Sequence, residues 1–115
     1  MGIIIVDHKL TANDIKIARE DHDTHIKITI DIFKETVLIG GELHYDAEQI
    51  LINKHGSRQQ NIWGGGYDLV AKKIRTEAMI NLRGNNDSTE ILDSVARKKF
   101  VSLTETIVRK IVKLI

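Results

Sequence analysis

The sequence lacks cysteine and any long hydrophobic run, and both absences exclude classes of protein. Without cysteine the chain can form no disulfide, no thiolate metal site and no cysteine nucleophile, so any metal or covalent chemistry must use His, carboxylates or hydroxyls. The apolar run near the N-terminus, Ile3 to Val6, spans only four residues. A bilayer-spanning helix needs ~20 residues, and a signal-peptide core is also longer. We therefore expect a soluble cytoplasmic protein with no membrane partner.

Familiar catalytic and cofactor motifs are missing as well. The sequence has no nucleophile elbow for a Ser, His and Asp arrangement, no dinucleotide fingerprint and no zinc-finger spacing. The glycine-rich WGGGYD, residues 63–68, lacks the Gly-Lys-Ser/Thr that would complete a phosphate loop. The sequence thus indicates no particular cofactor, and it favours a protein that is not an enzyme.

The length of the chain predicts one domain, and its charges are distributed unevenly, with a basic C-terminal segment. At 115 residues the chain has the commonest domain size, so we expect a single domain over residues 1–115. Residues 1–93 carry 11 Lys and Arg against 15 Asp and Glu, whereas residues 94–115 carry 6 against the single Glu105. Such a basic segment can bind nucleic acid, but it can equally dock on the acidic part of its own or another chain.

Periodicity predicts an antiparallel sheet near the N-terminus. Residues 25–33 alternate strictly between isoleucine and mostly polar side chains, which is typical of a strand, and residues 36–41 form the second arm of a hairpin. A further buried strand is predicted at residues 3–6. Between the first two strands along the chain, Thr11 and Asp14 resemble a capping box that begins a short helix.

The middle of the chain predicts further strands. Residues 49–53 (QILIN) and 58–64 (RQQNIWG) form a second hairpin around the turn HGS, and residues 76–83 (TEAMINLR) alternate like another strand. The glycine-rich residues 64–73 form a flexible connection. The fold class is therefore α+β, with a single mainly antiparallel sheet, a short N-terminal helix and a long C-terminal amphipathic helix.

The C-terminal helix is the most informative element. Asp93 is its predicted N-cap, and the apolar side chains cover an arc of roughly 200° around its axis, about twice the stripe that a surface helix needs. We expect one edge of the helix to cover the sheet and the other to meet a second subunit, so the sequence predicts a homo-oligomer. In the alternative, loops or the first helix of the same chain cover the excess.

Three segments together resemble a known family. GGELHYDAE at residues 40–48, ILINKHGSRQQNIWG at residues 50–64 and AMINLR at residues 78–83 are similar to a family of short prokaryotic proteins described only as a domain of unknown function. The resemblance extends from Ile3 to the final helix and implies an α+β domain. It implies no activity and assigns no catalytic residue.

The first candidate site lies within GGELHYDAE. If this segment is a strand, Glu42, His44 and Asp46 share one face at ~6.6 Å intervals. They could then hold a divalent cation, or a carboxylate could orient His44 as a base. If the segment is a helix, the acids form a solvated face instead. His22 and His25 are a weaker metal candidate, because the turn between them would splay the rings.

A second group of candidates surrounds the only tryptophan. Trp63 can stack on a planar ligand, and Gln59 before it can supply hydrogen bonds, although a lone Trp more often anchors a core. Arg83, close to Asn85, is a candidate for binding an anion, and its alternative role is a structural ion pair.

Three functions remain open from the sequence. The favoured one is an oligomeric binding or accessory protein with a polar pocket for a small ligand or ion, lined by His44, Trp63 and Arg83. The alternative is a small metal-dependent or acid/base enzyme centred on Glu42, His44 and Asp46. A nucleic-acid binder using the basic C-terminal helix ranks last, because the helix has no interleaved aromatic residues and no helix-turn-helix pair before it.

Overall fold

The structure is a computed structural model that describes residues 2–115. One sheet of five strands has the order β1-β3-β2-β4-β5, and all neighbours in it are antiparallel. The strands are β1 (Ile3–Ile5), β2 (His25–Asp31), β3 (Thr36–Gly40), β4 (Ile62–Asp68) and β5 (Lys73–Arg75). The helices are α1 (Ala12–Ala18), α2 (His44–His55) and α3 (Ser94–Leu114), with short 3-10 helices η1 (Gln59–Asn61) and η2 (Met79–Asn81). The predicted α+β class is confirmed.

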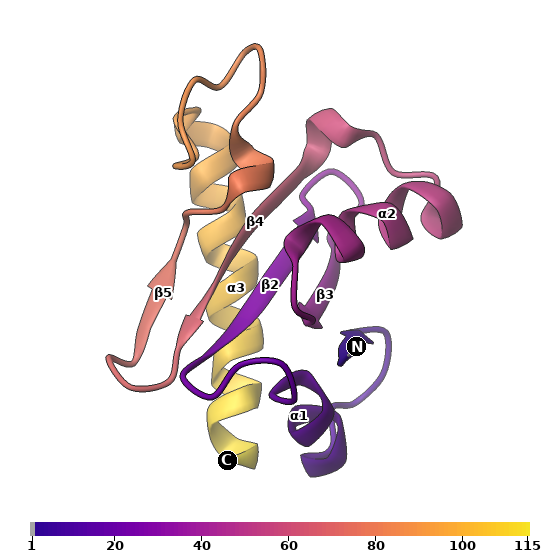
Figure 1. Ribbon diagram of the computed structural model, residues 1–115, viewed down its shortest axis with the longest axis vertical. Coiled ribbons are helices and arrows are strands. Elements are labelled where there is room, and N and C mark those ends of the chain that lie inside the picture. The colour runs from indigo at the N-terminus through magenta and orange to yellow at the C-terminus, as the bar shows by residue number, and fades with distance from the viewer. Residues whose placement is uncertain (1) are drawn as a thin grey trace.

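The two faces of the sheet are covered unequally, as Figure 1 shows. Helix α3 crosses one face, where Ile26, Ile28 and Ile30 of β2 belong to the same core as Phe100 of the helix. Helix α2 lies over only part of the opposite face. The smaller core beneath it consists of Leu38, Ala47, Leu51 and Ile62. Beside α2, the face formed by β4, β5 and the beginning of β2 is covered by no α-helix of residues 2–115, and the short η2 lies against it (Figure 1).

Side-chain caps account for where two helices begin. The Thr11 hydroxyl accepts the Asp14 N–H at 3.2 Å, and the Asp14 carboxylate accepts the Thr11 N–H at 2.9 Å, which is the predicted capping box. The Asp93 carboxylate accepts the Ala96 N–H at 2.9 Å, so Asp93 is the N-cap of α3 as predicted. Each cap joins two residues that are three positions apart, and such a local pair can be recognised in a sequence.

The predicted strand at residues 49–53 is wrong, because these residues lie in α2. Ala47 and Leu51, one helical turn apart, are fully buried against the sheet, which is the spacing of a helix face. Gly56 does have the positive φ expected of a turn residue, at 64°, but it is the C-cap of α2 and not the centre of a hairpin.

Gly64, Gly65 and Gly66 lie inside β4, so the predicted flexible connection at residues 64–73 is also wrong. Two of these glycines allow rings to pack closely on opposite faces of the sheet. A Cβ on Gly64 would lie 2.9 Å from Cδ2 of His44, and a Cβ on Gly65 would lie 2.8 Å from the Phe100 ring. Both distances are shorter than real contacts of this kind, so the strand needs glycine at these two positions.

Residues 76–83 contain η2 and do not form the predicted strand. A side chain takes the place of that strand beside β4. The Asn81 Oδ1 accepts the Gly64 N–H at 2.8 Å, and its Nδ2 donates to the Gly64 carbonyl at 2.9 Å. These are the two kinds of bond that a residue of a neighbouring strand would make. The amide thus continues the pairing of β4 beyond the end of β5.

Helix α3 buries a narrower stripe than its apolar arc. The buried residues are Ala96, Phe100, Thr104, Ile107 and Ile111. Val95, Val112 and Ile115 are exposed by 76%, 51% and 61%. None of the helices in residues 2–115 combines the length and the hydropathy needed to cross a membrane.

Homo-oligomerisation through α3 stays a prediction, and the exposed Val112 and Ile115 provide its test. We expect sedimentation velocity at micromolar concentration to give a mass above that of one chain. Val112→Glu is expected to shift the species to the monomer, because a charge in an apolar interface is costly. A clean monomer for the unaltered chain would contradict the prediction.

Candidate functional site

The segment from Glu42 to Asp46 does not form the strand on which the metal and acid/base hypotheses rest. Leu43 is the N-cap of α2, so His44 begins the helix and Asp46 lies in its first turn. Glu42 precedes the helix, and side chains two residues apart on a helix are rotated by about 200°, so His44 and Asp46 do not share a face. Among residues 2–115, no group of three or more His, Asp or Glu is placed to hold a metal ion.

His44 lies over the sheet, close to the glycines of β4. Its Nε2 is 2.6 Å from the Gly65 carbonyl oxygen, which can only accept, so Nε2 carries the proton and Nδ1 presents a lone pair. Burial, assisted by the nearby Lys27, lowers the pKa of His44 from 6.5 to about 4. His44 is therefore a neutral imidazole near pH 7.

Three further basic side chains, His22, His25 and Lys27, lie near His44, and the four residues form what we name the basic cluster. The His22 and His25 rings stack with centroids 4.3 Å apart, and His22 Nε2 donates to the Glu42 carbonyl at 3.1 Å. Burial lowers the pKa of His25, and so do His22 and Lys27; burial also lowers the pKa of Lys27. Within residues 2–115, no member of the basic cluster forms an ion pair.

The basic cluster lies along a groove beside α2, which we name the open groove. The groove consists of two adjoining cavities of about 310 and 550 Å³ that share Lys27, His44 and Glu77. The smaller cavity is polar, and its other lining residues are His25, Gly65, Gly66, Tyr67, Asp68 and Arg75. The larger cavity is more apolar, and its other lining residues are Leu43, Tyr45, Ala78, Met79, Ile80 and Thr89.

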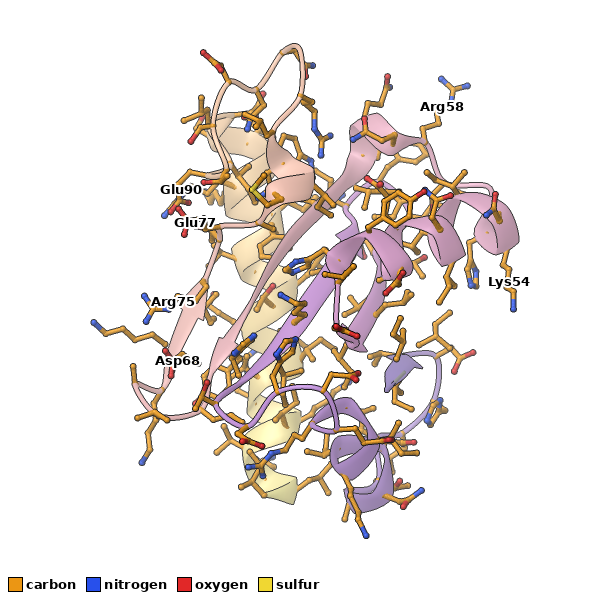
Figure 2. The ribbon with its side chains drawn as sticks, in the orientation of Figure 1. Lys54, Arg58, Asp68, Arg75, Glu77 and Glu90 are labelled. Carbon is orange, nitrogen blue, oxygen red and sulfur yellow. The ribbon has the colours of Figure 1, made fainter. Side chains whose placement is uncertain are left out.

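The acids on the β5 side of the open groove already have partners. Asp68 accepts two backbone N–H groups of the following turn and pairs with the Arg75 guanidinium at 3.0 Å, and these contacts hold its pKa below the usual range. Glu77 accepts the Thr89 hydroxyl at 3.1 Å. Figure 2 labels Asp68 at the end of β4, Arg75 at the end of β5 and Glu77 just after β5. Asp68 and Arg75 therefore neutralise each other, whereas Glu77 has a hydroxyl partner but no cationic one within residues 2–115.

The candidates around the tryptophan do not line the open groove. Trp63 belongs to the core beneath α3 and is only 6% exposed. The Arg83 guanidinium lies 4.0 Å from the centre of its ring and donates to three backbone carbonyls at 2.6–3.1 Å, including that of Gln59. Asn85 is exposed in the turn that follows. The sheet separates Trp63 from His44, so these two residues do not share a pocket.

Lys27 and Gly66 were not candidates from the sequence. The strict alternation of residues 25–33 does place Lys27 on the polar face of its strand, which is a usable signal. Lys27 has no carboxylate partner within residues 2–115, and this could not be predicted without knowing which strand lies beside β2. That neighbour is β4, whose glycines are more typical of a loop than of a central strand.

Fold and site together define a small α+β domain with an open groove that is basic at one end. The chain matches the model of the family described as "Protein of unknown function (DUF5674)" over residues 4–110, and it belongs to that family. The resemblance seen in the sequence is thereby confirmed. No curated protein and no solved structure matches the chain.

Proposed function

We propose that the protein is a binding domain for a small anionic ligand, which the open groove holds against Lys27. The observation that carries the proposal is the Lys27 ammonium, partly buried near three histidines and forming no ion pair within residues 2–115. A charge withdrawn from water is costly unless an opposite charge faces it. A bound anion would supply that opposite charge.

The strand register supports the proposal by placing a second cation across from Lys27. Lys27 of β2 and Arg75 of β5 are both paired with Gly66 of β4, so they lie on one face of the sheet, roughly 10 Å apart. Gly66 contributes no side chain between them. An anion above Gly66 would meet the Lys27 ammonium on one side and, on the other, the Arg75 guanidinium, which already pairs with Asp68 at 3.0 Å. Lys27 is therefore the main partner for a carboxylate or a phosphate.

The histidines favour the same kind of ligand. Positive neighbours lower the pKa of His25 and His44, in addition to the effect of burial. A bound anion would act in the opposite direction and stabilise their protonated forms. The histidines of the basic cluster can therefore take up protons when an anion binds, which residues already in ion pairs could not do.

The two alternatives from the sequence have weaker support. The hypothesis of a metal-dependent or acid/base enzyme depends on a strand that the chain does not form. For the nucleic-acid binder, Lys99 on α3 pairs with Glu35 at 3.5 Å, and Arg109 donates to the Thr106 hydroxyl at 3.3 Å. Both remain hypotheses without an observation that favours them over the anion site.

A titration with inorganic phosphate, followed by two-dimensional ¹H–¹⁵N NMR at low salt, tests the proposed function. We expect saturable shifts of the amide signals of Lys27 and Gly66. Lys27→Gln is expected to weaken binding about tenfold or more, because a hydrogen bond to a charged group contributes about 1.5–3 kcal/mol. Lys98→Gln is the matched control, since it removes an exposed lysine from α3, on the opposite side of the sheet.

The control variant should bind phosphate as the unaltered chain does. Shifts that fail to saturate, or an affinity that is the same in Lys27→Gln, would contradict the proposed function. An unchanged thermal midpoint shows that Lys27→Gln is folded, so that a weaker affinity reports on the site.

A further inference from the structure

The larger cavity of the open groove has an apolar wall made by two separate segments. Leu43 and Tyr45 at the beginning of α2 are exposed by 55% and 57%, and Met79 of η2 by 73%. Single exposed apolar residues are ordinary on a protein surface. Here they surround one cavity, together with Ala78 and Ile80, and come from segments more than thirty residues apart. Such a grouping is typical of a binding surface.

This apolar wall is continuous with the basic cluster. Lys27, His44 and Glu77 line both cavities, so the polar and apolar halves of the open groove meet at these three residues. The larger cavity alone, at about 550 Å³, is within the range of small-molecule pockets. A ligand that occupies both halves must therefore carry a charged group at one end and an apolar group at the other.

We propose that the ligand of the open groove is a small amphipathic anion, with its anionic head above Gly66 beside Lys27 and its apolar chain or ring against Leu43 and Met79. The inference rests on the proposed function and adds the chemical class of the ligand. Charge complementarity places the head beside Lys27, because this ammonium forms no ion pair within residues 2–115, whereas Arg75 already pairs with Asp68. The tail binds the apolar wall because this contact removes apolar surface of both from water.

Three probes that differ in head or tail test this inference by ¹H–¹⁵N NMR: octanoate, acetate and octanol. Octanoate has both head and tail, acetate has only the head, and octanol has a tail with an uncharged head. We expect octanoate to shift the amide signals of Lys27 and Gly66 together with those of Ala78 and Ile80. Burial of three methylene groups would make octanoate bind about fiftyfold more tightly than acetate.

Two substitutions in the apolar wall separate the tail from the head. Met79→Gln and Leu43→Ser are expected to weaken octanoate about tenfold and to leave acetate unchanged. Serine is a favourable N-cap, so Leu43→Ser should not destabilise α2. Val95→Gln is the matched control, because Val95 is an equally exposed apolar residue on α3.

The outcomes distinguish this inference from the proposed function. If acetate and octanoate bind with equal affinity, the anion site stands and the amphipathic ligand is overturned. If octanol binds as tightly as octanoate, the charged head is not recognised and the inference also fails. If neither anion shifts the groove signals, the proposed function itself fails. Sedimentation of the protein with phosphatidylglycerol vesicles, without binding of free octanoate, would overturn a free ligand in favour of a lipid surface.

Discussion

Replacing Asn81 by alanine is expected to lower the free energy of unfolding by about 4 kcal/mol, measured by urea denaturation. Asn81 is completely buried, and its amide accepts the Gly64 N–H and donates to the carbonyls of Gly64, Thr76 and Thr89. Alanine would leave the Gly64 N–H and carbonyl without this partner, although the Thr89 carbonyl would keep the Ala78 N–H, and each buried unpaired group costs about 1–3 kcal/mol. The volume of the lost amide adds a cavity term.

The matched control for this prediction is Asn85→Ala. Asn85 lies in the same loop but is exposed, so its replacement should change the stability by no more than about 0.5 kcal/mol. A loss below about 1 kcal/mol for Asn81→Ala would show that water takes over the hydrogen bonds of the amide at little cost.

The position of Asn81 also connects stability to the open groove. Ala78, Met79 and Ile80 immediately precede it and form one wall of the larger cavity. The hydrogen bonds between Asn81 and Gly64 hold this wall against β4. A second buried amide, that of Asn86, donates to the Asn81 carbonyl at 2.9 Å and orders the turn behind it. The groove is thus built on a loop that buried side-chain amides fasten to the sheet.

The parts of the fold that the sequence predicts correctly depend on contacts between near neighbours. The alternation of residues 25–33 identifies β2, and the pairs Thr11 with Asp14 and Asp93 with Ala96 identify the beginnings of α1 and α3. In each case the deciding residues lie within a few positions of one another. Their arrangement therefore follows from local geometry.

The parts that the sequence predicts wrongly depend on distant contacts. Ile50, Leu51 and Ile52 are compatible with a strand or a helix by composition, and the helix is favoured because Leu51 packs with Leu38 and Ile62. Three consecutive glycines suggest a loop. They lie in a central strand because β4 must admit rings from two helices, on opposite faces.

The candidate site was only partly predictable for the same reason. His44 was a candidate from the sequence, but through a strand geometry that the chain does not adopt. Its proximity to Lys27, 17 positions earlier in the chain, follows from the docking of α2 on β4. Arg83 was a candidate for its charge, and the structure places its guanidinium against backbone carbonyls and the Trp63 ring.

The stability of the protein is expected to fall by up to about 3 kcal/mol as the pH decreases from 6.5 to about 4, through His44 alone. In the unfolded chain this histidine binds a proton below its ordinary pKa of 6.5, whereas in the folded chain burial keeps it neutral down to about 4. The unfolded state therefore gains protons first, and folding becomes less favourable. Above pH 6.5 the residue is neutral in both states and contributes no pH dependence.

His44→Gln isolates this contribution, because glutamine cannot titrate but can still donate a hydrogen bond to the Gly65 carbonyl. We take the free energy of unfolding of the unaltered chain minus that of the variant, measured by urea denaturation at each pH. This difference should fall by up to about 3 kcal/mol as the pH decreases from 6.5 to about 4. Carboxylates that titrate in the same range are common to both proteins and cancel in the difference. Parallel pH profiles would contradict the prediction. Adding inorganic phosphate, which stays an anion throughout this pH range, should reduce the pH-dependent loss, since an anion beside Lys27 stabilises the protonated imidazole and offsets the cost of its burial.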